Sequence, residues 1–273
     1  MAESKHLTQE NIMQTNLIHE ALLQADLSQA GGLKKKDGST SQHRAFYHAV
    51  SKQRWMVYQK REYLYWLQQK DELSLRQNFV QHMYVPLLQK HLSTLAVAAD
   101  KLQILEFGCG PVCTAQYVDQ GKKTYVDPLM DDYRRLFPAT LPEKSTYLAL
   151  MAEEVDLPED NYDMVLCLNV LSDVHNPELV LNHVADYLSH DGVFMVSMDL
   201  WPTWLAKLHV FCAHFLPSLP GLNRLYSYTR QGFVHSLSRH FELTAAYKLK
   251  TGLRSLSLRQ EWMFVCQRKQ KGD

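Results

Sequence analysis

The sequence lacks an excess of either charge, because 29 lysine and arginine residues are balanced by 29 aspartate and glutamate residues. A strongly basic chain is typical of nucleic-acid binding, so this balance predicts no nucleic-acid partner. The sequence also lacks an uninterrupted apolar run of about 18 residues, the length that spans a membrane. Its first residues lack the basic-then-apolar pattern of a secretory signal. We therefore expect no transmembrane segment and no signal peptide.

The Cys-x-x-Cys spacing of many metal and redox sites is lacking too. The five cysteines contain no Cys-x-x-Cys motif, and their number is odd. Cys167 and Cys266 lie in apolar runs that are typical of core strands. We interpret all five cysteines as reduced thiols, which favours a cytoplasmic location, and we expect no metal site.

Length and composition predict three regions. The 273 residues suffice for one large domain with an extension. Residues 1–44 are polar and are predicted to be a flexible N-terminal segment. Residues 45–100 are helical in pattern and rich in aromatic residues, which predicts a helical extension or cap. Residues 101–273 are predicted to form the main domain, with a lid-like insertion at residues 201–228.

Strand and helix patterns alternate through the main domain. Unbroken apolar runs such as Met164–Asn169 are typical of central parallel strands. Asn176 followed by Pro177 predicts the start of a helix that ends near Leu188. A helix is also expected to begin at Val112. Seven strands are expected, at 102–107, 124–126, 147–150, 164–169, 193–198, 241–249 and 262–267. This order predicts a doubly wound, mostly parallel α/β sheet with an antiparallel closing strand.

Polar and glycine residues follow the ends of four of these strands. They are the turn from Glu106 to Gly110, then Asp127, then the stretch from Ala152 to Glu154, and finally Asn169. Ligands bind beyond the carboxyl ends of the strands in an open α/β sheet, so these groups are expected to share one crevice. Glycine permits a tight turn and a close approach of the ligand to the backbone. An acid about 20 residues after such a turn suits ribose hydroxyls.

These motifs resemble those of class I S-adenosylmethionine-dependent methyltransferases. The resemblance covers about Phe79 to Gln267 and rests on the stretches LEFGCGP at 105–111, YVDP at 125–128, EEVDLP at 153–158 and DNYDMV at 160–165. It implies a Rossmann-like fold and direct displacement of the sulfonium methyl group. A nicotinamide-binding domain is the nearest alternative, but it favours a third glycine where this chain has Cys113.

The resemblance also implies roles for particular residues. Gly108, Cys109 and Gly110 would lie against the methionine portion of the cofactor, and Glu106 would hold its ammonium group directly or through water. Asp127 would bind the ribose, and Pro128 would flank the adenine. Residues expected near the adenine amine are Ala152 and either Glu153 or Glu154, while Asn169 would contact the methionine end. The chain lacks the Asn-Pro-Pro-aromatic motif at Asn169, which disfavours amino groups of bases or protein amides as acceptors.

The methyl acceptor is less clearly indicated. Asp173 and His175 follow the fourth strand and are candidate general bases, although a capping acid and a polar loop residue are the alternatives. Aromatic residues suit an apolar acceptor pocket, so Trp55, Tyr58, Tyr65 and Trp204 are the candidate substrate residues, with core packing as the alternative. We expect a small-molecule or lipid-like acceptor, and the insertion leaves peripheral membrane contact open. A non-catalytic S-adenosylmethionine-binding partner protein is the alternative function.

Overall fold

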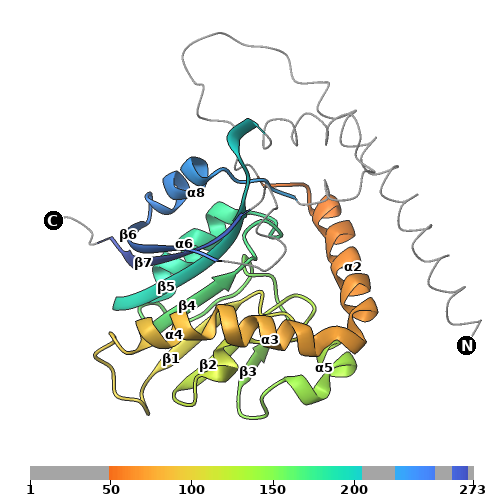
Figure 1. Cartoon of the computed structure of the whole chain (residues 1–273), viewed down its shortest axis with the longest axis horizontal. Coiled ribbons are helices and arrows are strands. Elements are labelled where there is room, and N and C mark those ends of the chain that lie inside the picture. Colours follow the sequence, from red (N-terminus) through yellow and green to blue (C-terminus); the bar gives the residue numbers. More distant parts are fainter. Residues whose placement is uncertain (1–48, 205–224, 250–259, 270–273) are drawn as a thin grey trace, which may run out of the picture.

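The computed structural model describes residues 49–204, 225–249 and 260–269. The predicted N-terminal segment 1–44 and most of the predicted lid insertion lie outside these residues. Seven strands form one sheet in the order β3-β2-β1-β4-β5-β7-β6 (Figure 1). Their bounds are β1 Gln103–Phe107, β2 Lys122–Val126, β3 Thr146–Leu148, β4 Tyr162–Leu168, β5 Leu188–Leu200, β6 Phe241–Lys248 and β7 Gln260–Arg268.

Strand direction agrees with the predicted fold class. The pairs β2–β3, β1–β2, β1–β4 and β4–β5 are all parallel. Strand β7 is antiparallel to both β5 and β6, and it lies between them. The structure therefore confirms a doubly wound, mostly parallel sheet that is closed by an antiparallel strand.

Successive side chains along a strand point to opposite faces of the sheet. They fill two hydrophobic cores, one on each face. Leu105 and Val165 face a core that includes residues of helices α6 (Pro177–Tyr187) and α8 (Arg230–Leu237). Their neighbours Ile104 and Met164 face the other core, which includes residues of helices α3 (Leu73–Met83), α4 (Val85–Leu92) and α5 (Met130–Leu136). All four side chains are fully buried, which explains why these strands read as continuous apolar runs.

Helix α6 begins where the sequence predicts. The side chain of Asn176 accepts a hydrogen bond from the backbone N–H of Leu179, and Pro177 occupies the first turn of α6. The side chain of Thr229 caps α8 in the same way. Such caps satisfy backbone N–H groups that have no partner within the helix.

The helix expected to begin at Val112 is much shorter than predicted. Only a 3₁₀ helix, Thr114–Tyr117, follows the glycine turn. The chain is extended at Cys113, immediately before this helix, and again at Val118, immediately after it. A left-handed glycine, Gly121, then leads the chain into β2. Because both flanking residues are extended, the segment has no room for more than one helical turn.

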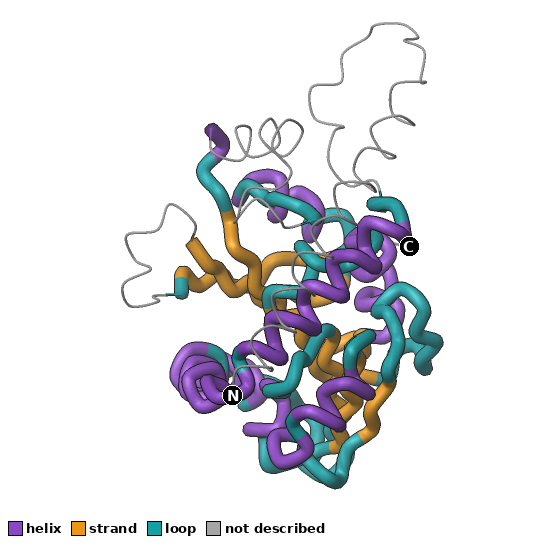
Figure 2. The backbone as a smooth tube through the Cα atoms, turned by 90° about the vertical axis from the view of Figure 1, so that its right-hand side faces the viewer, coloured by secondary structure: helices purple, strands orange, loops and turns teal. Residues whose placement is uncertain are grey.

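Helix α2 (Lys52–Gln68) lies apart from the two helix layers and beside the end of the sheet (Figure 1). Figure 2 faces the side on which α2 lies and shows it crossing in front of the strands. Ser51 caps its first turn. Just before this cap, the backbone N–H of Val50 donates to the carbonyl of His175 and to the hydroxyl of Tyr226. The start of α2 is thereby tied to the loop that follows β4.

Candidate functional site

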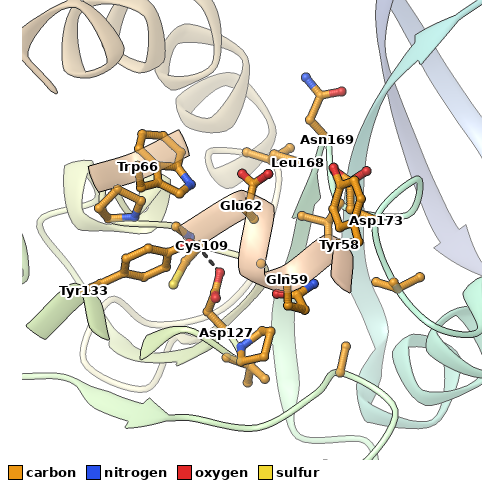
Figure 3. A pocket seen from close by; sticks show the side chains of 18 of the residues that line it. Tyr58, Gln59, Glu62, Trp66, Cys109, Asp127, Tyr133, Leu168, Asn169 and Asp173 are labelled. Atoms are coloured by element: carbon orange, nitrogen blue, oxygen red, sulfur yellow. Dashed lines mark hydrogen bonds between the residues drawn. The ribbon is translucent and has the colours of Figure 1, made fainter. Parts of the chain in front are cut away.

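A cavity of about 350 Å³ lies between α2 and the carboxyl ends of β1, β2, β4 and β5. This size is within the range of small-molecule and cofactor sites. Figure 3 shows side chains from the sheet edge and from α2 on its walls. The four predicted strand-end features all contribute to the cavity lining, as expected for the carboxyl edge of a doubly wound sheet.

The glycine turn forms the floor of the cavity. Gly108 and Gly110 both have φ +60°, which disfavours residues with a side chain. A Cβ atom on Gly108 would lie 2.3 Å from the side chain of Val170, so this glycine allows close packing under the turn. A Cβ atom on Gly110 would meet only the ring of Trp66, at 3.7 Å, and would therefore project into the cavity. The backbone at Gly110 is thus open to a ligand.

Asp127 links the glycine turn to the end of β2. One of its carboxylate oxygens accepts from the backbone N–H of Gly110 at 3.0 Å, and the other accepts from Leu129 at 2.9 Å. The residue is only 6% exposed, yet it lines the cavity. Burial raises the pKa of Asp127 to about 6, against the effect of its two backbone hydrogen bonds. Figure 3 shows Asp127 beside Cys109, which also lines the cavity.

Glu106 lies under the turn, and it is not among the residues that line the cavity. Its two carboxylate oxygens accept from the backbone N–H groups of Thr114 and Ala115, at 2.9 and 2.8 Å. The residue is 2% exposed, and burial raises its pKa to about 7. This placement differs from direct contact with a ligand ammonium group, which is one of the two arrangements that the resemblance implies. In the described structure, Glu106 holds the 3₁₀ helix against the end of β1.

We predict that Glu106→Gln lowers the free energy of unfolding more than it changes cofactor affinity. A carboxamide offers one acceptor where two N–H groups need one each, so about 1–3 kcal/mol of stability should be lost. Denaturant unfolding gives the stability, and titration calorimetry with S-adenosylhomocysteine gives the affinity. A stable variant with a large loss of affinity would contradict this placement and restore the ligand-binding role.

Asn169, just after the end of β4, has a left-handed backbone conformation and a buried carboxylate as its hydrogen-bond partner. Its φ of +62° lies in the left-handed region. Its side-chain amide donates to the carboxylate of Glu261 at 3.0 Å, and the same carboxylate accepts from Ser197 and Tyr84. Asn169 lines the cavity, as predicted, and the buried network from β5, β7 and α3–α4 fixes its position.

The remaining residues predicted to bind the cofactor differ in whether they line the cavity. Pro128, Ala152 and Glu153 line the cavity. The carboxylate of Glu153 also accepts from the backbone N–H of Asn176 at 2.7 Å, which joins this wall to the start of α6. Glu154 is not among the lining residues, and it pairs with Lys52 on the exposed surface at 3.4 Å. Of the two alternatives for the adenine amine, Glu153 is therefore the one in position.

Three of the four predicted substrate residues lie on the cavity wall. Trp55, Tyr58 and Tyr65 line it from α2, and Trp55 is buried against the sheet core. Trp204 is 59% exposed and does not line the cavity. Its position beyond the end of β5 places it outside this pocket.

Only one of the two candidate general bases lines the cavity. Asp173 lines the cavity (Figure 3). Its carboxylate accepts from the hydroxyl of Ser172 at 2.9 Å. It is not the cap of α6, since Asn176 has that position. His175 does not line the cavity, and its carbonyl is the group that fastens α2 and Tyr226. The structure thus brings Asp173 to the site and leaves His175 beside it.

Sequence reasoning missed several lining residues. Glu62 and Trp66 come from α2, Arg76 from α3, Tyr133 from α5 and Asp199 from β5. The rings of Trp66 and Tyr133 meet edge to face at 6.4 Å, so α2 is packed against α5 at this end of the cavity. The aromatic helical pattern of residues 45–100 was a signal for Trp66, but no strand-end pattern marks Glu62 or Arg76.

Two further features concern metals and membranes. Within residues 49–204, 225–249 and 260–269, no three or more His, Cys, Asp or Glu side chains gather as metal ligands. Over the same part of the chain, every helix is too short or too polar to cross a bilayer.

Comparisons with known proteins agree with this geometry. The sequence model of a family described as a methyltransferase domain matches residues 76–240. A comparison with curated proteins found no match.

Among solved structures, a Burkholderia thailandensis 1,6-didemethyltoxoflavin-N1-methyltransferase is 16% identical, and the alignment covers 86% of this chain and 100% of that enzyme, with a TM-score of 0.57. The PH0226 protein of Pyrococcus horikoshii is 14% identical, and the alignment covers 71% of this chain and 91% of that protein, with a TM-score of 0.54. At these identities the two structures show a shared fold. With the family match, they establish that the chain belongs to the class I S-adenosylmethionine-dependent methyltransferases.

Proposed function

We propose that this enzyme transfers the methyl group of S-adenosylmethionine to a small-molecule or lipid-like acceptor bound between α2 and the ends of β4 and β5. The observation that carries the proposal is that the same cavity is lined by cofactor-type residues of the sheet edge and by aromatic residues of α2. The aromatic side chains that α2 contributes to the wall suit packing against a compact or apolar acceptor.

The residues of the sheet edge fit the cofactor. Gly110 leaves its backbone open to the cavity, and Asp127 is a buried carboxylate that can accept hydrogen bonds from two ribose hydroxyls. Pro128, Ala152 and Glu153 would border the adenine, and Asn169 the methionine end. Gly108 and Cys109 would complete the floor, with Glu106 supporting it from below.

The chemistry itself needs little from the protein. The cofactor supplies an electrophilic methyl group on a sulfonium, and the enzyme contributes by holding the acceptor in line with it. Trp55, Tyr58 and Tyr65 would enclose the acceptor. Where the accepting atom carries a proton, Asp173 is the carboxylate on the wall that would take it.

The Burkholderia enzyme is named for a small-molecule acceptor, which is consistent with this use of the fold. We test the proposal with S-adenosylmethionine that carries a trideuterated methyl group. The enzyme is incubated in parallel with small-molecule, lipid, nucleic-acid and protein fractions of a cell extract, and labelled products are detected by mass spectrometry. A labelled product of low mass is expected from the wild type and not from Gly110→Asn. Binding of S-adenosylhomocysteine without any labelled product would support the alternative, a non-catalytic binding protein. Label found only on nucleic acid or protein would overturn the acceptor class.

A further inference from the structure

One acidic side chain is buried in an otherwise apolar part of the sheet. Glu261 lies near the start of β7 and is only 7% exposed, and the residues Met263–Cys266 that follow in the same strand are buried apolar side chains. Burial raises the pKa of the Glu261 carboxyl, because an ionised group is costly to remove from water. A carboxylate in such surroundings therefore calls for a role that an apolar residue could not fill.

Three donors meet one oxygen of this carboxylate. Oε1 of Glu261 accepts from the side-chain amide of Asn169 at 3.0 Å and from the hydroxyl of Ser197 at 3.1 Å. The same oxygen accepts from the hydroxyl of Tyr84. The hydroxyls of Ser197 and Tyr84 lie 3.4 Å apart, so these two groups can also pair with each other. Of the three donors, Asn169 is the one that belongs to a residue of the cavity lining.

The amide of Asn169 lies behind the cavity wall. Figure 3 shows it directed away from Glu62 and Asp127, its Nδ2 donates to Glu261, and its Oδ1 is fully buried. The backbone of the same residue has φ +62°. A positive φ is uncommon for a residue with a side chain, although asparagine tolerates it better than most. Such conformations persist where the surroundings hold them, and the bond to Glu261 is an anchor of this kind.

The left-handed turn at Asn169 sets the position of the wall that follows it. The side chain of Val170 packs so closely on Gly108 that a Cβ atom on that glycine would lie 2.3 Å from it. The backbone N–H of Asp173 donates to the carbonyl of Val170 at 2.8 Å, which fixes the turn that carries the candidate base. Val170, Gly108 and Asp173 all line the cavity. A rotation of the backbone at Asn169 would displace this whole part of the wall.

We propose that Glu261 is a positioning residue of the methyl-transfer site, which acts by holding the turn at Asn169 in its left-handed conformation. Val170 is thereby kept against the glycine turn, and Asp173 on the cavity wall. None of the residues of β7 lines the cavity, so this strand contributes to the site only from behind. The inference rests on the assignment of this cavity as the S-adenosylmethionine site.

The test is a double-mutant cycle on the affinity for S-adenosylhomocysteine, measured by titration calorimetry. Glu261→Met replaces the acceptor with an apolar side chain of similar length, and it is made in the wild type and in Asn169→Gly. Glycine adopts a positive φ without a side-chain anchor, so Glu261 should lose its role in that background. We expect Glu261→Met to lower affinity by about 10-fold in the wild type and by less than about 2-fold in Asn169→Gly, whatever the affinity of Asn169→Gly itself.

Ser197→Ala is the matched control, because it removes another donor from the same carboxylate oxygen and leaves the bond to Asn169 in place. Its affinity should stay within about 2-fold of the wild type. Thermal unfolding of every variant shows whether it is folded. Equal losses from Glu261→Met in both backgrounds would overturn the proposal, because Glu261 would then act through its charge or through general packing. An unchanged affinity in Glu261→Met would overturn it as well.

A second comparison decides the question if Glu261→Met does not fold. Asn169→Ala and Asn169→Gly both lack the amide, but only alanine disfavours the left-handed backbone. Asn169→Ala should therefore bind S-adenosylhomocysteine at least about 5-fold more weakly than Asn169→Gly, and equal affinities would contradict the proposal. If the wild type does not bind this ligand, the cofactor assignment itself fails, which is a distinct result.

Discussion

Gly110→Asn should abolish measurable binding of S-adenosylhomocysteine while the protein stays folded. The Cβ atom and the amide would enter the cavity beside Trp66, in the space a cofactor must occupy. Asparagine is chosen because it tolerates the left-handed backbone that φ +60° requires, so steric exclusion is separated from backbone strain. We expect at least about a 100-fold loss of affinity by calorimetry, equivalent to about 2.8 kcal/mol.

Cys109→Ala is the matched control for this experiment. Cys109 also lines the cavity, but its buried side chain packs into the core, and the substitution removes atoms instead of adding them. Its effect on affinity should be only a few-fold. Normal binding by Gly110→Asn, or equal losses in the two variants, would show that the ligand does not approach the backbone at this turn.

Asp127→Asn should weaken binding of S-adenosylhomocysteine by about 10- to 100-fold, because a charged acceptor facing ribose hydroxyls becomes a neutral group with one acceptor. The fold should also lose some stability, since both carboxylate oxygens accept backbone hydrogen bonds. Asp163→Asn is the control. Asp163 accepts from the backbone N–H of Gln103 at 2.9 Å, at the opposite end of β1 and away from the cavity. Equal affinity losses in the two variants would remove Asp127 from the ribose site.

The raised pKa of Asp127 adds a dependence on pH. Its value of about 6 in the folded protein exceeds the value of about 3.9 for an unfolded chain. The folded state therefore binds this proton more tightly, and Asp127 lowers stability as the pH rises from about 4 to about 6. Ligand binding has the opposite trend, because the ionised form is the better acceptor. Affinity for S-adenosylhomocysteine should fall as the pH drops below about 6, and Asp127→Asn should lack this step. A flat wild-type profile would argue that the proton is not linked to binding.

The sheet could be predicted because each strand carries its own local evidence. The run from Met164 to Leu168 is buried on both faces, and the cap at Asn176 marks where α6 begins. Both signals are short-range. The same applies to the strand-end residues, since parallel strands bring their carboxyl ends to one edge whatever their exact lengths.

The contacts that could not be predicted, and the lining residues that were missed, depend on the packing of distant segments of the chain. The sequence shows an acid beside a glycine turn. It does not show that two backbone N–H groups donate to the carboxylate of Glu106 below the turn. The partner of Asn169 is 92 residues away, at Glu261, and it arrives only through the antiparallel register of β5 and β7. Arg76 comes from a helix that precedes the whole sheet, and no local pattern shows which way it faces.

Helix α2 also has a consequence for how this enzyme can diversify. Its cavity-facing residues come from one continuous stretch of 17 residues, whereas the cofactor-facing residues are distributed over the ends of several strands. Substitutions in that stretch alter the enclosed space without touching the register of any strand. If α2 encloses the acceptor as proposed, acceptor preference is a separable trait, and exchanging α2 between homologous enzymes is the most direct route to new methylation products on an unchanged scaffold.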